Sequence, residues 1–225
     1  MSTRYIKMLL AMAEGSVVSL EVFFLTIIFS IPLAMVIAAG RMARNKPLSS
    51  SVNLLLLVVR GTPLMLQLLV VYFGPGIFIN WLNSFGFDVN FRWNRFPAAI
   101  VALSVNYACY FAEIYRGGFE SIPKGQYEAC KVLGYSRFQT FFRIIVPQVV
   151  KRIVPAMGNE VITLVKDTAL VSVIGVGELL LVAKERQSAL FSFTPLFIAG
   201  VFYFVMNAIV SLVFNKIEKK LSYYN

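Results

Sequence analysis

Polar side chains recur at helical spacing in one otherwise apolar segment of the chain. Glu160, Thr163 and Asp167 stand at positions i, i+3 and i+7, which places them on one helix face, with Asn159 and Lys166 beside them. An unpaired charge at membrane depth costs about 3 kcal/mol or more, so such a stripe is a candidate solute site. The alternative is an internal ion pair of Lys166 with one of the acids. Two acids and one base would still leave a carboxylate over for a cationic group.

A second polar group surrounds the sequence Arg60-Gly61-Thr62-Pro63, which is followed by Gln67. Arg60 and Gln67 are seven positions apart and share a helix face. A Gly-x-Pro break in a membrane helix frees backbone groups that need protein or cavity water as partners. We expect Arg60 and Gln67 at the solute site; for Arg60, a structural kink with the guanidinium reaching the headgroups is the alternative.

Asn106 and Tyr107 supply a third group, and Tyr110 and Glu113 follow at helical spacing. We expect Asn106 and Tyr107 to contact the solute. Tyr110 is more typical of packing. Glu113 can instead form an ion pair with Arg116 or Arg137.

Catalytic chemistry is largely excluded. The chain has no histidine, and Cys109 and Cys130 have no zinc-like spacing. A Walker A sequence is also absent, so any ATP must be bound by another chain. We therefore expect no enzyme active site, no metal and no cofactor here.

The segments that carry these residues belong to a membrane protein. The composition is 58% hydrophobic and 14% charged, with a mean hydropathy of +0.74, which is typical of an all-α polytopic membrane protein. About five spans of roughly 20 residues are expected; they cover residues 17–39, 52–73, 97–115, 150–168 and 195–214. Residues 1–15 are expected to lie on the membrane surface. Residues 169–183, which contain glycines and Glu178, are expected to form a re-entrant or lateral helix lining a cavity.

The basic residues give the orientation, and they do not indicate nucleic acid despite the net charge of +10. With the N-terminus outside and the C-terminus cytoplasmic, 13 basic residues fall inside and 6 outside. The outer ones are Arg4, Lys7, Arg92, Arg95, Lys184 and Arg186. Both the basic segment 116–152 and the basic tail 216–220 should be cytoplasmic, so residues 149–183 cross only once.

A polar, basic loop follows the third span. Residues 124–133 can form a short amphipathic helix that Gly134 ends in a left-handed conformation, and Ser136 can cap a second helix. An interfacial helix lying on lipid is the alternative. The spacing E-A-x4-G-x9-I-x-x-P, from Glu128 to Pro147, resembles the coupling loop of membrane subunits of binding-protein-dependent ABC importers. Cys130 and Val146 depart from the usual E-A-A-x3-G-x9-I-x-L-P form.

Three further motifs extend the resemblance over nearly the whole chain. They are R-G-T-P-L-x-x-Q at 60–67, Y-x-x-E-I-Y-R-G-G at 110–118 and G-N-E-V-I-T-L-V-K-D-T-A-L at 158–170. The chain resembles the polar amino acid branch of ABC importer permeases. This implies a type I importer-like fold, a single permease domain over residues 1–225, and a coupling loop at about 117–147. Within that loop, the resemblance assigns ATPase coupling to Glu128, Ala129 and Gly134.

The resemblance also implies partners and a function. A dimer with the same chain or a paralogous permease, two ATPase subunits that bind ATP and Mg, and an extracellular solute-binding protein are expected, in the bacterial plasma (inner) membrane. The cargo would be a basic or other polar L-amino acid, and Glu160 would correspond to the acid of the N-E pair in permeases for basic amino acids. The alternative is an ion-coupled secondary transporter with Glu160 and Asp167 as proton sites. The absence of an inverted repeat in the sequence and the docking loop argue against it.

The orientation can be tested by cysteine labelling. An impermeant thiol reagent added outside should label Ser84→Cys and Ser188→Cys, and should not label Ser50→Cys, Ser136→Cys or Ser222→Cys, with the parent chain as background. Labelling of Ser222→Cys from outside would mean that residues 169–183 are a true span.

Overall fold

The computed structural model describes residues 2–91 and 94–221. Arg92 and Ser222, which the orientation argument uses, lie outside the described residues. The described elements are α1 (Ser2–Arg41), α2 (Lys46–Gly61), α3 (Leu64–Asn83), α4 (Arg95–Glu120), α5 (Lys124–Val132), α6 (Arg137–Gln139), the π-helix η1 (Thr140–Ile145), α7 (Val146–Asp167), the 3-10 helix η2 (Thr168–Ile174), α8 (Leu179–Leu190) and α9 (Thr194–Leu221).

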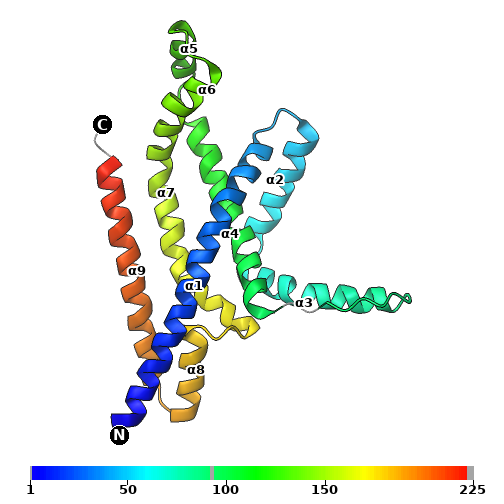
Figure 1. Cartoon of the computed structure of the whole chain (residues 1–225), viewed down its shortest axis with the longest axis vertical. Coiled ribbons are helices and arrows are strands. Elements are labelled where there is room, and N and C mark those ends of the chain that lie inside the picture. The colour runs from blue at the N-terminus through cyan, green and yellow to red at the C-terminus, as the bar shows by residue number, and fades with distance from the viewer. Residues whose placement is uncertain (1, 92–93, 222–225) are drawn as a thin grey trace.

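Long helices dominate this architecture (Figure 1). By length and apolar composition, four of the described helices can cross a membrane, namely α1, α3, α4 and α9. The 22-residue α7 is less apolar because it carries the charged stripe around Glu160. The expected all-α polytopic fold is therefore confirmed.

The first helix is longer than predicted. It runs without interruption for 40 residues, so the expectation that residues 1–15 form a separate surface helix is wrong. Met8 and Met12 are buried in a cluster with Leu179 and Ala183 of α8. This packing accompanies a helix that continues through Gly15 and Ser16 without a break.

The second predicted span, residues 52–73, is wrong as a single helix. The chain breaks at Thr62 and Pro63, and α3 points away from the bundle (Figure 1). Pro63 lacks an amide hydrogen and disfavours helical geometry in the residue before it, and Thr62 is extended at φ −117° and ψ 148°. The break therefore separates α2 from α3.

The core lies around α4, against which α1, α2, α3 and α7 all pack. Both α1 and α4 bury several small residues, a composition that lets two helix backbones approach closely. On α1 they are Thr26, Ser30, Ala34 and Ala38, and on α4 they are Ala98, Ala99, Ala102, Ala108 and Ala112, all buried. This close packing makes α4 the central helix of the bundle.

Residues 169–183 form no continuous helix. The 3-10 helix η2 ends at Gly175, whose φ of +78° is left-handed, and α8 begins after Glu178. The expectation that Glu178 lines a cavity is wrong, because its side chain is fully buried. Its carboxylate accepts hydrogen bonds from the amides of Leu180 and Leu181, both at 2.8 Å, and so caps α8. The hydroxyls of Ser19 and Tyr203 also donate to it.

The basic tail and the basic loop lie at the same end of the molecule. The C-terminal end of α9 lies at the same end as α5 and α6, and α1 begins at the opposite end beside α8 (Figure 1). This arrangement agrees with the predicted orientation, in which the basic loop and the basic tail share the cytoplasmic side.

Two adjacent glycines of α4 give a matched test of this packing. A Cβ at Gly118 would overlap Ile153 of α7 and lie 3.1 Å from Cγ1 of Val149, whereas a Cβ at Gly117 meets nothing within 4 Å. We expect Gly118→Ala to lower the free energy of unfolding by about 1–3 kcal/mol through overpacking. Gly117→Ala should be neutral or slightly stabilising. Equal melting temperatures of the two variants in detergent would contradict the described contact of α4 with α7.

Candidate functional site

The coupling segment, defined as residues 124–145, begins with α5. This helix ends in a Schellman motif, in which the Tyr135 amide donates to the Cys130 carbonyl at 3.0 Å and the Gly134 amide donates to Lys131 at 3.2 Å. Gly134 is left-handed, with φ +76°. The predicted short helix and its glycine terminus are confirmed.

The second part of the coupling segment leads directly into α7. Ser136 caps α6 through a capping box, since its hydroxyl accepts from the Gln139 amide and the Gln139 side chain accepts from the Ser136 amide. The predicted N-cap is thus confirmed. Beyond α6 the backbone stays helical through η1, where the amide of Val146 donates to the carbonyl of Phe141. The segment after Ser136 is therefore a rigid extension of α7.

The outer surface of the coupling segment is exposed and partly apolar. Glu128 and Ala129 are exposed, and the exposed fractions of Val132 and Leu133 are 88% and 73%. The segment lies at the tip of the molecule, beyond the ends of α4 and α7 (Figure 1). Exposed apolar residues rimmed by charges are typical of a protein docking surface.

A separate polar cavity of about 180 Å³ lies where the break between α2 and α3 faces α4 and α7. Three helical segments that are far apart in sequence contribute to it. The lining residues are Thr62, Leu64, Asn106, Tyr107, Tyr110, Glu160, Thr163 and Asp167. Five of the residues predicted for the solute site are brought together here, namely Glu160, Thr163, Asp167, Asn106 and Tyr107.

The two acids of the cavity differ in their partners. Asp167 accepts a hydrogen bond from the Tyr107 hydroxyl at 2.7 Å, which ties α7 to α4. Glu160 is half-buried, and within the described residues its carboxylate has neither a hydrogen-bond donor nor an ion-pair partner. Lys166 is exposed, and among the described residues it forms no ion pair with Glu160 or Asp167. The cavity therefore holds a carboxylate that is free to receive a cationic group.

Gln67 lies at the edge of this cavity and stabilises the helix break. Its side-chain amide nitrogen donates to the Val59 carbonyl at 2.6 Å and to the hydroxyl of Thr62 at 2.9 Å. Its carbonyl accepts from the Asn106 side chain at 2.9 Å. Backbone groups freed by Pro63 thus gain a side-chain partner, and the break is fixed against α4.

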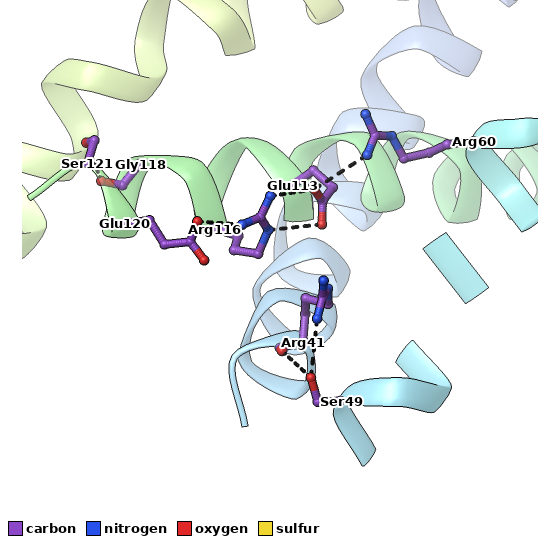
Figure 2. A network of polar contacts seen from close by, with 8 residues as sticks. All are labelled: Arg41, Ser49, Arg60, Glu113, Arg116, Gly118, Glu120 and Ser121. Carbon is purple, nitrogen blue, oxygen red and sulfur yellow. Dashed lines mark hydrogen bonds and ion pairs between the residues drawn. The ribbon is translucent and has the colours of Figure 1, made fainter. Parts of the chain in front are cut away.

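Arg60 lies at the end of α2 in a network of charges (Figure 2). Its guanidinium is 3.5 Å from the carboxylate of Glu113 and 5.3 Å from the ring centre of Tyr110, which lines the cavity. Glu113 is also held by two hydrogen bonds from Arg116, of 3.2 and 2.9 Å, and Arg116 reaches Glu120. The network therefore extends along α4 from the edge of the cavity to the last turn of the helix.

Not every predicted residue reaches the cavity, and some lining residues were not predicted. Asn159 is exposed and is absent from the lining. Tyr110, placed with packing residues above, lines the cavity, and its spacing of four from Asn106 was a usable signal. Thr62 and Leu64 carried no such signal, because their position depends on the direction in which the chain leaves the break.

Comparison with known proteins places these features in context. Residues 30–223 match the family model described as the binding-protein-dependent transport system inner membrane component. The arginine transport system permease protein ArtQ of Bacillus subtilis is 36% identical over 209 residues, covering 92% of this chain and 91% of that protein. A putative glutamine transport system permease protein, GlnP of Rickettsia felis, is 30% identical over 95% of this chain and 94% of its own length.

Solved structures of transporters also superpose on this chain. The crystal structure of an amino acid ABC transporter with histidines has a chain that superposes with a TM-score of 0.83 at 33% identity, with 96% of both chains covered. The methionine transporter MetNI superposes with a TM-score of 0.70 at 19% identity over 96% of each chain, which shows a shared fold alone.

Proposed function

The chain belongs to the family of inner membrane components of binding-protein-dependent transport systems, and from this premise we propose that it carries a basic L-amino acid through the cavity between α2, α4 and α7. The chain is the translocation subunit of an ATP-driven amino acid importer. The observation that carries the substrate proposal is the carboxylate of Glu160, which faces this cavity with no protein partner among the described residues.

The cavity offers complementary charges for a zwitterionic solute. Glu160 would receive the side-chain cation or the α-ammonium group, since a cation beside an unpaired carboxylate gains a charge-assisted hydrogen bond. Arg60 would receive the α-carboxylate. It can do so because Glu113 already accepts two hydrogen bonds from Arg116 and does not depend on Arg60 for neutralisation.

Relatives support a polar amino acid, and the arginine permeases among them favour a basic one. Two of the similar proteins are arginine permeases, ArtQ and the ArtM protein of Haemophilus influenzae, and the most similar solved structure described above contains histidines. Glutamine permeases are also similar, so a neutral polar cargo is the competing proposal. Nothing in the comparisons supports an ion-coupled secondary transporter.

The complex we propose contains two permease chains, either two copies of this chain or this chain with a paralogue. Two ATPase subunits that bind ATP and Mg would seat on the coupling segments, and an extracellular solute-binding protein would deliver the amino acid. The location would be the bacterial inner membrane. Glu128, Ala129 and Gly134 would contribute to ATPase docking, since the exposed surface of α5 carries the first two and Gly134 ends that helix.

The helical continuity described above suggests how ATP hydrolysis would reach the cavity. α6, η1 and α7 form one run of helix, and α7 carries both Glu160 and Asp167. A displacement of the coupling segment would therefore move the acidic wall of the cavity relative to α4. Rigid-body motion of this kind is sufficient to alternate access to a central site.

The substrate proposal predicts the effect of removing one charge. Glu160→Gln keeps the side-chain size, and we expect it to remove an attraction of about 1–3 kcal/mol, or roughly 5- to 150-fold in apparent affinity. Asp167→Asn should have a smaller effect because the Tyr107 hydroxyl remains beside it. Glu185→Gln, at an exposed position on α8, is the charge-matched control and should be silent.

The measurement is ATP-driven uptake of labelled arginine, lysine, histidine, glutamine and cystine into vesicles that contain the full complex. Unchanged uptake of the best substrate by Glu160→Gln would exclude Glu160 from the site. A preference of the wild type for glutamine or cystine would exclude a basic cargo and leave the importer function intact.

The docking role of the coupling segment gives a further prediction. A Cβ meets nothing within 4 Å at either Gly125 or Gly134, but only Gly134 has a positive φ. Gly134→Ala should therefore strain the end of α5 by about 1–2 kcal/mol, whereas Gly125→Ala should be tolerated. We expect Gly134→Ala, and Glu128→Lys through charge reversal, to weaken ATPase binding and solute-stimulated hydrolysis.

Co-purification of the ATPase from detergent and the hydrolysis rate in vesicles measure this effect. Wild-type ATPase binding and stimulation in both Gly134→Ala and Glu128→Lys would contradict the docking assignment.

A further inference from the structure

A large apolar groove lies at the end of the bundle that carries α5 and η1. It has a volume of about 760 Å³ and is bordered by α1, α4, α5, η1 and α7. Nearly all of its wall is hydrocarbon. The lining residues are Met35, Ala38, Ala39, Met42, Tyr115, Phe119, Tyr127, Phe141, Phe142, Val146, Val149, Val150 and Ile153. A groove of this composition cannot bind a polar amino acid.

The groove lies on the side of α4 that faces away from the solute cavity. Tyr115 lines the groove, and it follows Asn106, which lines the cavity, by nine residues. At 3.6 residues per turn, nine residues make roughly two and a half turns, so the two side chains leave α4 in opposite directions. The groove is therefore separate from the polar cavity.

Basic residues are sequence neighbours of residues that line the groove. Met42 lies between Arg41 and Arg44 at the end of α1, and Arg143 directly follows Phe142 in η1. These positions belong to the cytoplasmic end of the spans, where lipid headgroups lie and where anionic lipids attract Lys and Arg.

Two carboxylates are also sequence neighbours of lining residues. Glu120 follows Phe119 and is paired with Arg116. Glu128 follows Tyr127 and is exposed on α5. Among these sequence neighbours the three arginines outnumber Glu128, which is the carboxylate that Arg116 does not pair, so the apolar walls are flanked by net positive charge.

We propose that this groove binds one anionic phospholipid of the cytoplasmic leaflet, with an acyl chain between α1 and α7 and its phosphate beside Arg44 and Arg143. The wall of the groove includes Tyr127 of α5 and the aromatic pair Phe141 and Phe142 of η1, so the bound lipid also supports the coupling segment. The site is independent of which amino acid is carried.

Groove-filling variants test the site directly. Ala39 lines the groove and is exposed, so Ala39→Trp fills it without disturbing the packed core. Val36→Trp is the matched control, because Val36 is 70% exposed on the same helix and does not line the groove. The complete transporter is purified from membranes and its retained lipids are identified by native mass spectrometry. We expect retained phosphatidylglycerol in the wild type and in Val36→Trp, and its loss in Ala39→Trp.

The charge component is tested with the double variant Arg44→Gln, Arg143→Gln in nanodiscs of mixed phosphatidylglycerol and phosphatidylcholine. We expect its preference for retained phosphatidylglycerol to fall roughly tenfold or more. Lys184→Gln, on α8 at the other end of the molecule, should keep the wild-type preference. We also expect Ala39→Trp to lower solute-stimulated ATP hydrolysis. The wild-type transporter in nanodiscs of pure phosphatidylcholine should show the same lowered rate.

Four outcomes would overturn the proposal. They are equal lipid retention by Ala39→Trp and the wild type, equal loss in Ala39→Trp and Val36→Trp, retention of neutral lipid with no preference for phosphatidylglycerol, and disulfide crosslinking of Ala39→Cys to the second permease. The last result would assign the groove to the permease interface.

Discussion

The contact of α1 with α4 is the most extensive helix contact of the described bundle, and α2, α3 and α7 also pack on α4. Alanine, serine and threonine side chains on both helices allow the backbones to approach, and lipid offers no hydrophobic force that could replace this packing. The central helix α4 has one face toward Glu160 and the polar cavity, and another toward the apolar groove beside α1. The two sites are thus built on opposite sides of one helix.

Three acids of the bundle are held by partners, and Glu160 differs from them. Asp167 has Tyr107, Glu113 has Arg116, and Glu178 has the amides of its own helix end. In each case the partner compensates the cost of removing a charge from water. Glu160 lacks such a partner among the described residues, which favours a role in binding solute. The role of Glu178 is structural, because it caps α8.

Much of this arrangement could be predicted from local sequence. The coupling segment was predictable because its signals are local: Gly134 supplies a left-handed helix end and Ser136 a capping side chain. The face of α7 that carries Glu160 and Asp167 followed from helical spacing alone. The extension of α1 through Met12 and the direction of α3 after Pro63 could not be predicted, because tertiary contacts with α8 and α4 decide them. Glu178 was misread for the same reason, since its partners Ser19 and Tyr203 are distant in sequence.

The π-helix between Thr140 and Ile145 sets the rotation of α6 relative to α7 about their common axis. A π-turn accommodates one extra residue relative to a regular α-helix, and each residue turns a helix by about 100° and advances it by about 1.5 Å. Deleting a single residue there would change the rotation of α6 relative to α7 about the helix axis. The length of this segment therefore sets how the tip of the molecule is oriented relative to the acids of α7.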